Sequence, residues 1–222
     1  MTTRRFGSMF GCGAVAMALA VAAACGAGGS SAATAQAAEP MSCEAIADLA
    51  LAETTITLAE AVPAGPFTPP GANRPLDLPA FCRVAATTDP AVQFEVWLPA
   101  EGWNGKFHTA GNGGMAGVIS YAAMAGALER GYATASTDTG HVRPGAGSFD
   151  ASWALDRPDL IEDFGHRSLH MTAVNGKAIT EARYGAAPDH AYYVGCSKGG
   201  QQGMMEAQRY PEDFDGLVIG DP

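Results

Sequence analysis

A serine between glycines is the first residue in this chain whose surroundings suggest chemistry. Residues 195–199 read Gly-Cys-Ser-Lys-Gly, after an apolar, aromatic run at 190–194 and before a segment of helical character at 201–209. Glycines allow a tight turn between a strand and a helix, which lifts a serine hydroxyl to the top of a sheet beside a helix N-terminus. The pattern predicts that Ser197 is a nucleophile. The alternative is an ordinary strand-to-helix turn.

A hydrolytic serine also needs two backbone N–H groups that point at the developing alkoxide. One should come from Lys198, the residue after the serine. The other should come from the Gly-Asn-Gly-Gly loop at 111–114, where a side chain would block the approaching carbonyl group. We expect Gly114 to be this donor and Gly113 to be the second choice. The alternative is a plain glycine turn.

The base that should activate the serine is not evident. Serine is a poor nucleophile unless a base takes its proton, and in sites built on such a turn the acid and histidine follow the serine. Only 25 residues follow Ser197, and all histidines precede it: His108, His141, His166, His170 and His190. We therefore expect a partial form of a longer enzyme. Asp213, Asp215 and Asp221 follow too soon, and Asp215 is predicted to be a structural turn residue.

The histidines themselves favour structural roles. His141 is expected to bond a backbone carbonyl, with a place at the pocket mouth as the alternative, and His108 is expected to pack inside a strand. His166 and His170 have the one-turn spacing of a metal pair. No carboxylate or third ligand is evident for them, so no metal site is predicted.

The surrounding pattern predicts an α/β fold. Consecutive short strands come first and suggest an antiparallel start, and strands alternating with helices then indicate a mostly parallel sheet flanked by helices. Residues 93–98 alternate as in a half-buried strand. Strands are expected at 54–59, 81–86, 93–98, 106–110, 132–137, 191–194 and 216–219, helices at 42–52 (capped by Ser42), 121–130, 169–184 and 199–210, and loops at 63–79 and 139–156.

Three segments resemble the tannase and feruloyl esterase family of α/β hydrolases: WNGKFHTAGNGGMAG at 103–117, GYATASTDTGH at 131–141 and the last 30 residues from YVGCSKGG onward. The resemblance implies an α/β-hydrolase fold, incomplete at the C-terminus. It implies a secreted serine carboxylesterase that acts on a small aromatic ester, of feruloyl or galloyl type, through an acyl-enzyme. The family's lid, calcium site, acid and histidine would lie outside this chain, so no cofactor is expected here. The alternatives are a fragment without turnover, or a lipase or peptidase on the same fold.

The resemblance also bears on the cysteines. Cys196 would pair with a cysteine after the catalytic histidine, which this chain does not contain. Cys43 and Cys82 are then the natural remaining pair. The alternative is that all three are buried thiols.

Residues 1–38 resemble an export signal with a linker, and residues 39–222 are expected to be the N-terminal portion of the catalytic domain. Arg4 and Arg5 precede an apolar stretch at 13–24, too short to span a bilayer, and an A-x-A cleavage signal stands at 35–37. A weaker site at 22–26 would lipidate Cys25. A secreted or periplasmic location is expected, with a lipoprotein as the alternative.

The charge excludes some partners. The formal net charge is -10, and without the two arginines of the signal it is 11 basic against 23 acidic residues, or -12. Such a surface repels nucleic acids and anionic membranes. A neutral ester is compatible with it, and membrane attachment is expected only if Cys25 is lipidated.

Overall fold

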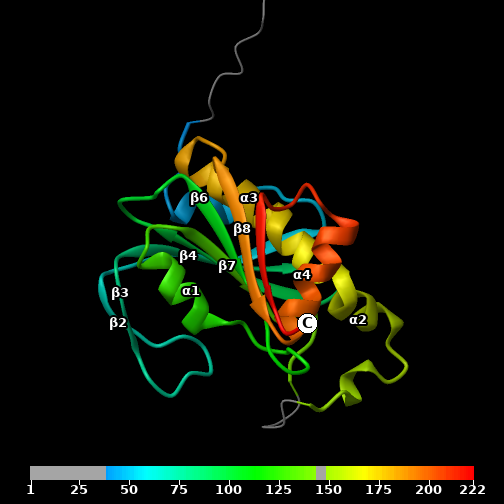
Figure 1. Cartoon of the computed structure of the whole chain (residues 1–222). Helices are drawn as coiled ribbons and strands as arrows, with labels where there is room; N and C mark the ends of the chain where they lie inside the picture. Colours follow the sequence, from blue (N-terminus) through cyan, green and yellow to red (C-terminus); the bar gives the residue numbers. More distant parts are fainter. Residues whose placement is uncertain (1–38, 144–148) are drawn as a thin grey trace, which may run out of the picture. The chain divides into compact units, whose positions relative to one another are not determined.

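The computed structural model describes residues 39–143 and 149–222 (Figure 1). The predicted signal peptide and linker, with both processing sites and Cys25, lie outside the described residues. Within the described part of the chain, no helix combines the length and the apolar character needed to cross a membrane.

A seven-stranded mixed sheet organises the described residues, in the order β1-β4-β5-β7-β6-β8-β9. The first four strands of this order pair antiparallel, and β7, β6, β8 and β9 pair parallel. The predicted α/β fold, with an antiparallel start and a parallel second half, is confirmed. The strands are β1 (Thr54–Val62), β4 (Phe81–Thr88), β5 (Val92–Pro99), β6 (Lys106–Ala110), β7 (Ala133–Thr137), β8 (His190–Cys196) and β9 (Gly216–Gly220).

The strand order reverses at β6, which lies between β7 and β8 although β7 follows it in the chain. Helix α1 (Tyr121–Leu128) connects β6 to β7, and α3 (Ser168–Tyr184) lies between β7 and β8. In Figure 1, α1 lies on one side of the sheet, while α3 and α4 (Lys198–Arg209) lie on the other. In open α/β sheets, such a reversal leaves a crevice at the carboxyl ends of the strands, where ligands bind.

Strand β5 is buried on both faces. Phe94, Val96 and Leu98 pack in the core cluster that includes residues of α3, whereas Trp97 packs in the second cluster, against residues of α1. Because successive side chains of a strand point to opposite faces, these two clusters occupy opposite sides of the sheet.

The prediction that residues 93–98 form a half-buried strand is therefore wrong. Glu95 is only 3 % exposed. Its carboxylate accepts hydrogen bonds from Arg83, at 2.6 and 2.9 Å, and from the indole N–H of Trp97 at 2.8 Å. A charged group can be buried when it is paired and hydrogen-bonded in this way.

The predicted loop at 63–79 is wrong in part, because it contains a two-stranded sheet of β2 (Gly65–Phe67) and β3 (Leu76–Leu78). The ring of Phe67 meets the rings of Phe81 and Trp97 edge to face, at 5.4 and 5.6 Å. These aromatic contacts fix a proline-rich segment that has little regular pattern of its own.

Most of the remaining elements follow the predictions closely but with different ends, whereas β6 has the predicted ends. The helix predicted at 42–52 is a 3-10 turn, η1 (Glu44–Asp48), and the Ser42 hydroxyl accepts the N–H of Ala45 at 3.2 Å. Helix α3 ends at Gly185, whose φ of 70° gives the left-handed cap that a glycine there favours. Between β7 and α3, where a loop was predicted up to residue 156, lies a short 3-10 turn, η2 (Ser152–Ala154), followed by α2 (Pro158–Glu162) and a π-helical turn (Asp163–Arg167).

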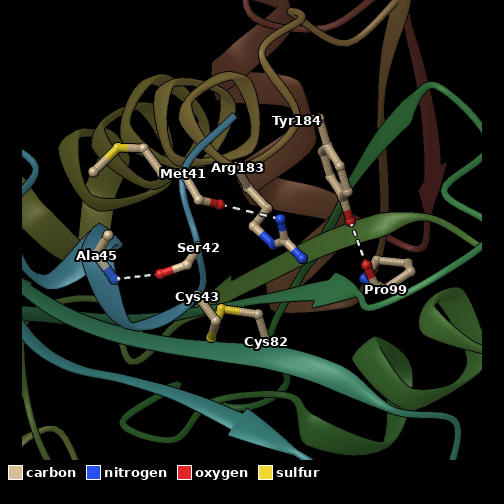
Figure 2. Close-up of a disulfide and its surroundings, with 8 residues drawn as sticks. All are labelled: Met41, Ser42, Cys43, Ala45, Cys82, Pro99, Arg183 and Tyr184. Atoms are coloured by element: carbon tan, nitrogen blue, oxygen red, sulfur yellow. Dashed lines mark hydrogen bonds between the residues drawn. A yellow bond between two sulfur atoms is a disulfide. The ribbon is translucent and has the colours of Figure 1, made fainter. Parts of the chain in front are cut away.

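A disulfide joins Cys43 to Cys82 (Figure 2), as expected, with its Cα atoms 5.5 Å apart. The same N-terminal segment is tied to the end of α3, because the guanidinium of Arg183 donates to the Met41 carbonyl at 3.1 Å. Tyr184 donates to the Pro99 carbonyl at 2.8 Å. The disulfide and the Arg183 bond hold the start of the described chain against β4 and α3, and the Tyr184 bond joins the end of α3 to the end of β5. Among the described residues, Cys196 has no disulfide partner.

Candidate active site

Ser197 occupies a strained turn between β8 and α4. Its φ of 59° and ψ of -118° lie outside the regions that residues with a side chain ordinarily adopt. Its N–H donates to the Gly220 carbonyl at 3.0 Å, and its carbonyl accepts the N–H of Gln201 at 3.0 Å. Such strain persists only where surrounding structure enforces it, and it concentrates at functional sites. The Ser197 side chain is exposed, so its hydroxyl is accessible.

Close packing explains two of the glycines around this turn. A Cβ on Gly195 would lie 2.4 Å from the Tyr193 hydroxyl and 2.5 Å from the Gly199 carbonyl oxygen. A Cβ on Gly111, at the end of β6, would lie 2.2 Å from the same hydroxyl. The start of α4 therefore approaches the ends of β6 and β8 so closely that no side chain fits between them.

The loop at 111–114 lies directly beside the serine turn. Gly111 donates its N–H to the Val194 carbonyl at 2.9 Å, and Gly199 donates its N–H to the Asn112 carbonyl at 2.7 Å. Gly114 has a φ of 58°, which favours glycine. The N–H of Lys198 is in the first turn of α4, where a helix supplies no acceptor. The predicted oxyanion donors, Lys198 with Gly114 or Gly113, are thus on adjacent segments, and their role stays a prediction.

Sequence reasoning missed two side chains that join these segments. Asn112 and Gln202 are buried and hydrogen-bond to each other across 90 positions of sequence. The Gly-Asn-Gly-Gly pattern drew attention to its glycines, and nothing in the sequence singled out Gln202. Only the neighbouring positions of β6 and β8 in the sheet bring the two amides together.

The side chain of Lys198 was also missed, since only its backbone entered the prediction. It is 7 % exposed. Its ammonium donates to the Phe164 carbonyl at 2.7 Å and lies 3.3 Å from the centroid of the Phe164 ring. Burial lowers the pKa of Lys198 to about 7. Lys198 therefore anchors the π-helical turn to the start of α4, and π turns recur at functional sites.

His141 is a structural histidine, as preferred from the sequence. Its Nε2 lies 2.8 Å from the Met115 carbonyl, and its ring stacks on Trp153 with centroids 3.8 Å apart. Burial lowers the pKa of His141, so the ring is neutral at pH 7 and Nε2 donates to the carbonyl. His141 thereby holds the residue that follows Gly114, which makes it a support of the loop.

Most of the other histidines also form side-chain hydrogen bonds. The His108 ring is buried and hydrogen-bonds the Thr134 hydroxyl at 3.0 Å, as the packing prediction implies. His166 hydrogen-bonds the Tyr210 hydroxyl at 2.9 Å.

Asp215 accepts the N–H of Ala191 at 2.7 Å, which confirms that it is a structural turn residue.

The expectation that His170 has no carboxylate near it is wrong. His170 Nδ1 lies 2.6 Å from Oδ2 of Asp213, and Glu206 completes a cluster whose ligand-type atoms lie within 4.8 Å of one another. The pattern of one helix could not reveal this, because the three residues come from α3, α4 and the turn before β9.

Glu206 is the unusual member of this cluster. It is 1 % exposed, and neither carboxyl oxygen has a hydrogen-bond partner among the described residues. Burial, followed by the charge of Asp213, raises the pKa of Glu206. Lys177 already compensates Asp213, because its ammonium lies 3.6 Å from Oδ1 and donates to the Asp213 carbonyl at 2.8 Å. A protonated Glu206 adds no negative charge beside Asp213, so we interpret the cluster as a structural network.

A cavity of about 430 Å³ lies on the other face of β8 and β9, opposite α4. Its lining includes His108, Tyr132, Val194 and Val218, of which Val194 and Val218 are exposed. Ser197 does not line it. The cavity is therefore separate from the candidate active site.

The chain resembles known esterases over most of its length. It is 43% identical over 190 residues to an uncharacterised esterase from Xanthomonas campestris, covering 84% of this chain and 32% of that protein. It is 44% identical over 146 residues to a probable feruloyl esterase B-1 from Aspergillus fumigatus, covering 64% of this chain and 26% of that protein. The chain thus spans about a third or less of the length of these curated relatives.

Solved structures agree with these relatives. Feruloyl esterase B from Aspergillus oryzae superposes with a TM-score of 0.70 at 36% identity, covering 80% of this chain and 36% of that one. Tannin acyl hydrolase from Aspergillus niger gives a TM-score of 0.59 at 27% identity, covering 77% and 33%. The family model described as tannase and feruloyl esterase matches residues 78–222, which include the serine turn and the loop beside it. This chain therefore belongs to the tannase and feruloyl esterase family.

Proposed function

We propose that residues 39–222 form the N-terminal portion of the catalytic domain of a secreted serine carboxylic-ester hydrolase. The observation that carries the proposal is Ser197, an exposed serine on a strained turn between β8 and α4. The glycine loop after β6 lies beside this turn. A nucleophile and two backbone donors on adjacent segments are parts that acyl transfer requires.

In the proposed reaction, Oγ of Ser197 attacks the ester carbonyl carbon while a base takes the hydroxyl proton. The oxyanion accepts hydrogen bonds from the N–H of Lys198 and that of Gly114, with Gly113 as the alternative donor. The C–O bond then breaks, the alcohol leaves with the proton, and water hydrolyses the acyl-enzyme to the free acid. Protein groups supply every part of this chemistry, so the proposal requires no cofactor in this chain.

The base is proposed to be a residue outside these 222. His108 is buried and bonded to Thr134, and His190 begins β8, at the strand end opposite the serine. Nε2 of His141 donates to the Met115 carbonyl, which fits a supporting role in the loop, and His166 and His170 are bonded through Nδ1 to Tyr210 and Asp213. The acid partner is proposed to lie outside the chain as well.

The proposed substrate is a small ester of a phenolic acid, of feruloyl or galloyl type. The relatives named above as feruloyl esterases and a tannin acyl hydrolase support this class. Family membership makes a lipase or a peptidase the weaker alternative, and a fragment without turnover is the other. The acidic composition argues against nucleic acid as a partner.

The proposed location is secreted or periplasmic. The Cys43–Cys82 disulfide supports an oxidising compartment. Residues 1–38 would supply the export signal, and lipidation at Cys25 is the alternative anchor.

The test uses the full-length protein that contains these residues. Ser197→Ala should lower kcat for methyl ferulate or methyl gallate by about 10⁴-fold or more, because only binding and the oxyanion hole remain. Ser152→Ala, at an exposed serine outside the site, is the matched control. A fluorophosphonate should label Ser197 alone, as located by peptide mapping. Labelling of another serine, or a preference for long-chain fatty esters, would contradict the proposal.

A further inference from the structure

Asn112 and Gln202 form a reciprocal pair of hydrogen bonds between the loop after β6 and helix α4. The backbone N–H of Asn112 donates to Oε1 of Gln202 at 3.0 Å, and Nε2 of Gln202 donates to Oδ1 of Asn112 at 2.9 Å. A backbone N–H can only donate, so it fixes which end of the Gln202 amide faces the loop. Both residues are buried, where such a pair is shielded from competition by water.

The other polar groups of Asn112 are also occupied. Its side-chain nitrogen donates to the carbonyls of Val118 and Thr137, each at 2.8 Å, and its carbonyl accepts the N–H of Gly199 at 2.7 Å. Asn112 therefore connects β7, its own loop and the first turn of α4. A fully satisfied buried network of this kind holds its members in a single arrangement.

The pair joins the two segments that carry the proposed oxyanion donors. Asn112 precedes Gly114 by two residues, and Gln202 follows Lys198 by four, one helical turn. An oxyanion hole works when both donors lie about 2.7–3.1 Å from the developing charge, so a small change in the gap between the segments weakens it.

We infer that the Asn112–Gln202 pair is a positioning device that sets the separation of the Gly114 and Lys198 N–H groups. Neither amide contacts the substrate; both act through the backbone of the segments that they join. This inference rests on the proposed function of Ser197. Turnover would then require this pair of amides in addition to the nucleophile and the two oxyanion donors.

The first test measures turnover in the full-length enzyme. Gln202→Met keeps the side-chain length and removes both bonds, so kcat should fall by about 10²–10³-fold, as for loss of an oxyanion donor, with KM changed by less than about threefold. Gln202→Glu keeps an acceptor for the Asn112 N–H but sets a second acceptor against Oδ1 of Asn112, so kcat should fall here as well. Gln208→Met, the same substitution at an exposed position of α4, should leave both constants unchanged.

The second test does not depend on turnover. Hydrogen exchange should accelerate in residues 111–117 of Gln202→Met, while residues 190–196 of β8 keep wild-type rates. Unchanged exchange in 111–117 would overturn the inference, as would a folded Gln202→Met enzyme with kcat within about threefold of wild type. Faster exchange throughout the sheet, with kcat and KM altered together, would assign Gln202 to general stability and also overturn it. An inactive wild-type enzyme would contradict the proposed function, and exchange would still decide whether the pair holds the loop.

Discussion

The N–H of Gly111 donates a 2.9 Å hydrogen bond to the carbonyl of Val194. This bond continues the parallel pairing of β6 and β8 by one residue beyond the last strand pair, Ala110 with Val194. The glycine loop and the serine turn therefore leave the sheet at the same level and on neighbouring strands. That placement puts the backbone of the glycine loop beside the Ser197 turn.

Residues 1–222 expressed alone should show no measurable esterase activity, because the base proposed to activate Ser197 lies outside these residues. Strand β9 is the last in the sheet order, and an unpaired edge recruits other chains, so aggregation is also expected. The measurement is hydrolysis of methyl ferulate by soluble protein, with the full-length enzyme as the positive control. Turnover that disappears in Ser197→Ala would show that a histidine such as His141 acts as the base.

His141→Phe in the full-length enzyme should lower kcat by about tenfold, because one hydrogen bond that supports the oxyanion loop is lost. The phenyl ring retains the stacking on Trp153. The pH dependence of kcat/KM should stay that of wild type, since burial lowers the pKa of His141 and the ring is not the base. A loss approaching that of Ser197→Ala, or a missing acidic limb in the pH profile, would instead make His141 catalytic.

Glu206→Gln should change how stability depends on pH. Burial and the charge of Asp213 raise the pKa of Glu206 in the folded protein. The stability that this proton contributes is present below the ordinary carboxyl pKa and is lost as pH rises through the raised value. Between pH 5 and pH 8, the free energy of unfolding of the wild type should therefore fall relative to that of Glu206→Gln. The expected fall is at least about 1.4 kcal/mol, the equivalent of one pKa unit.

Chemical denaturation at the two pH values measures this difference. Glu212→Gln, at an exposed carboxylate, is the matched control and should follow the wild type at both. If the difference in the free energy of unfolding between wild type and Glu206→Gln is the same at both pH values, Glu206 is ionised in the folded state.

Removal of the Cys43–Cys82 disulfide should lower the free energy of unfolding by about 3–4 kcal/mol, according to the chain-entropy model. The two cysteines are 39 positions apart, so the closed loop is long enough for a sizeable effect. Denaturation of Cys43→Ser, Cys82→Ser and the double variant measures it. The double variant should cost little more than either single one, because all three break the same bond; additive losses would indicate that the cysteines act separately.

The sequence alone predicted those local features of the structure that depend on neighbouring residues. The glycines around Ser197 allow a tight turn, and the prediction of a strand-to-helix turn there is confirmed. The strand at 106–110 was predicted with its observed ends, and the Gly185 cap follows from the conformational freedom of glycine. Such features depend on neighbours within a few residues, so the sequence displays their causes directly.

Only the tertiary structure decided which distant side chains meet. Asn112 and Gln202 are 90 positions apart and meet because β6 lies beside β8; His170 and Asp213 are 43 apart and meet because α3 and the turn before β9 pack together. The alternation in β5 correctly separated its two faces, but it could not show that both are covered, since burial depends on what packs against each face. Strand order and packing partners are set by the free energy of the whole core, and no short segment contains that information.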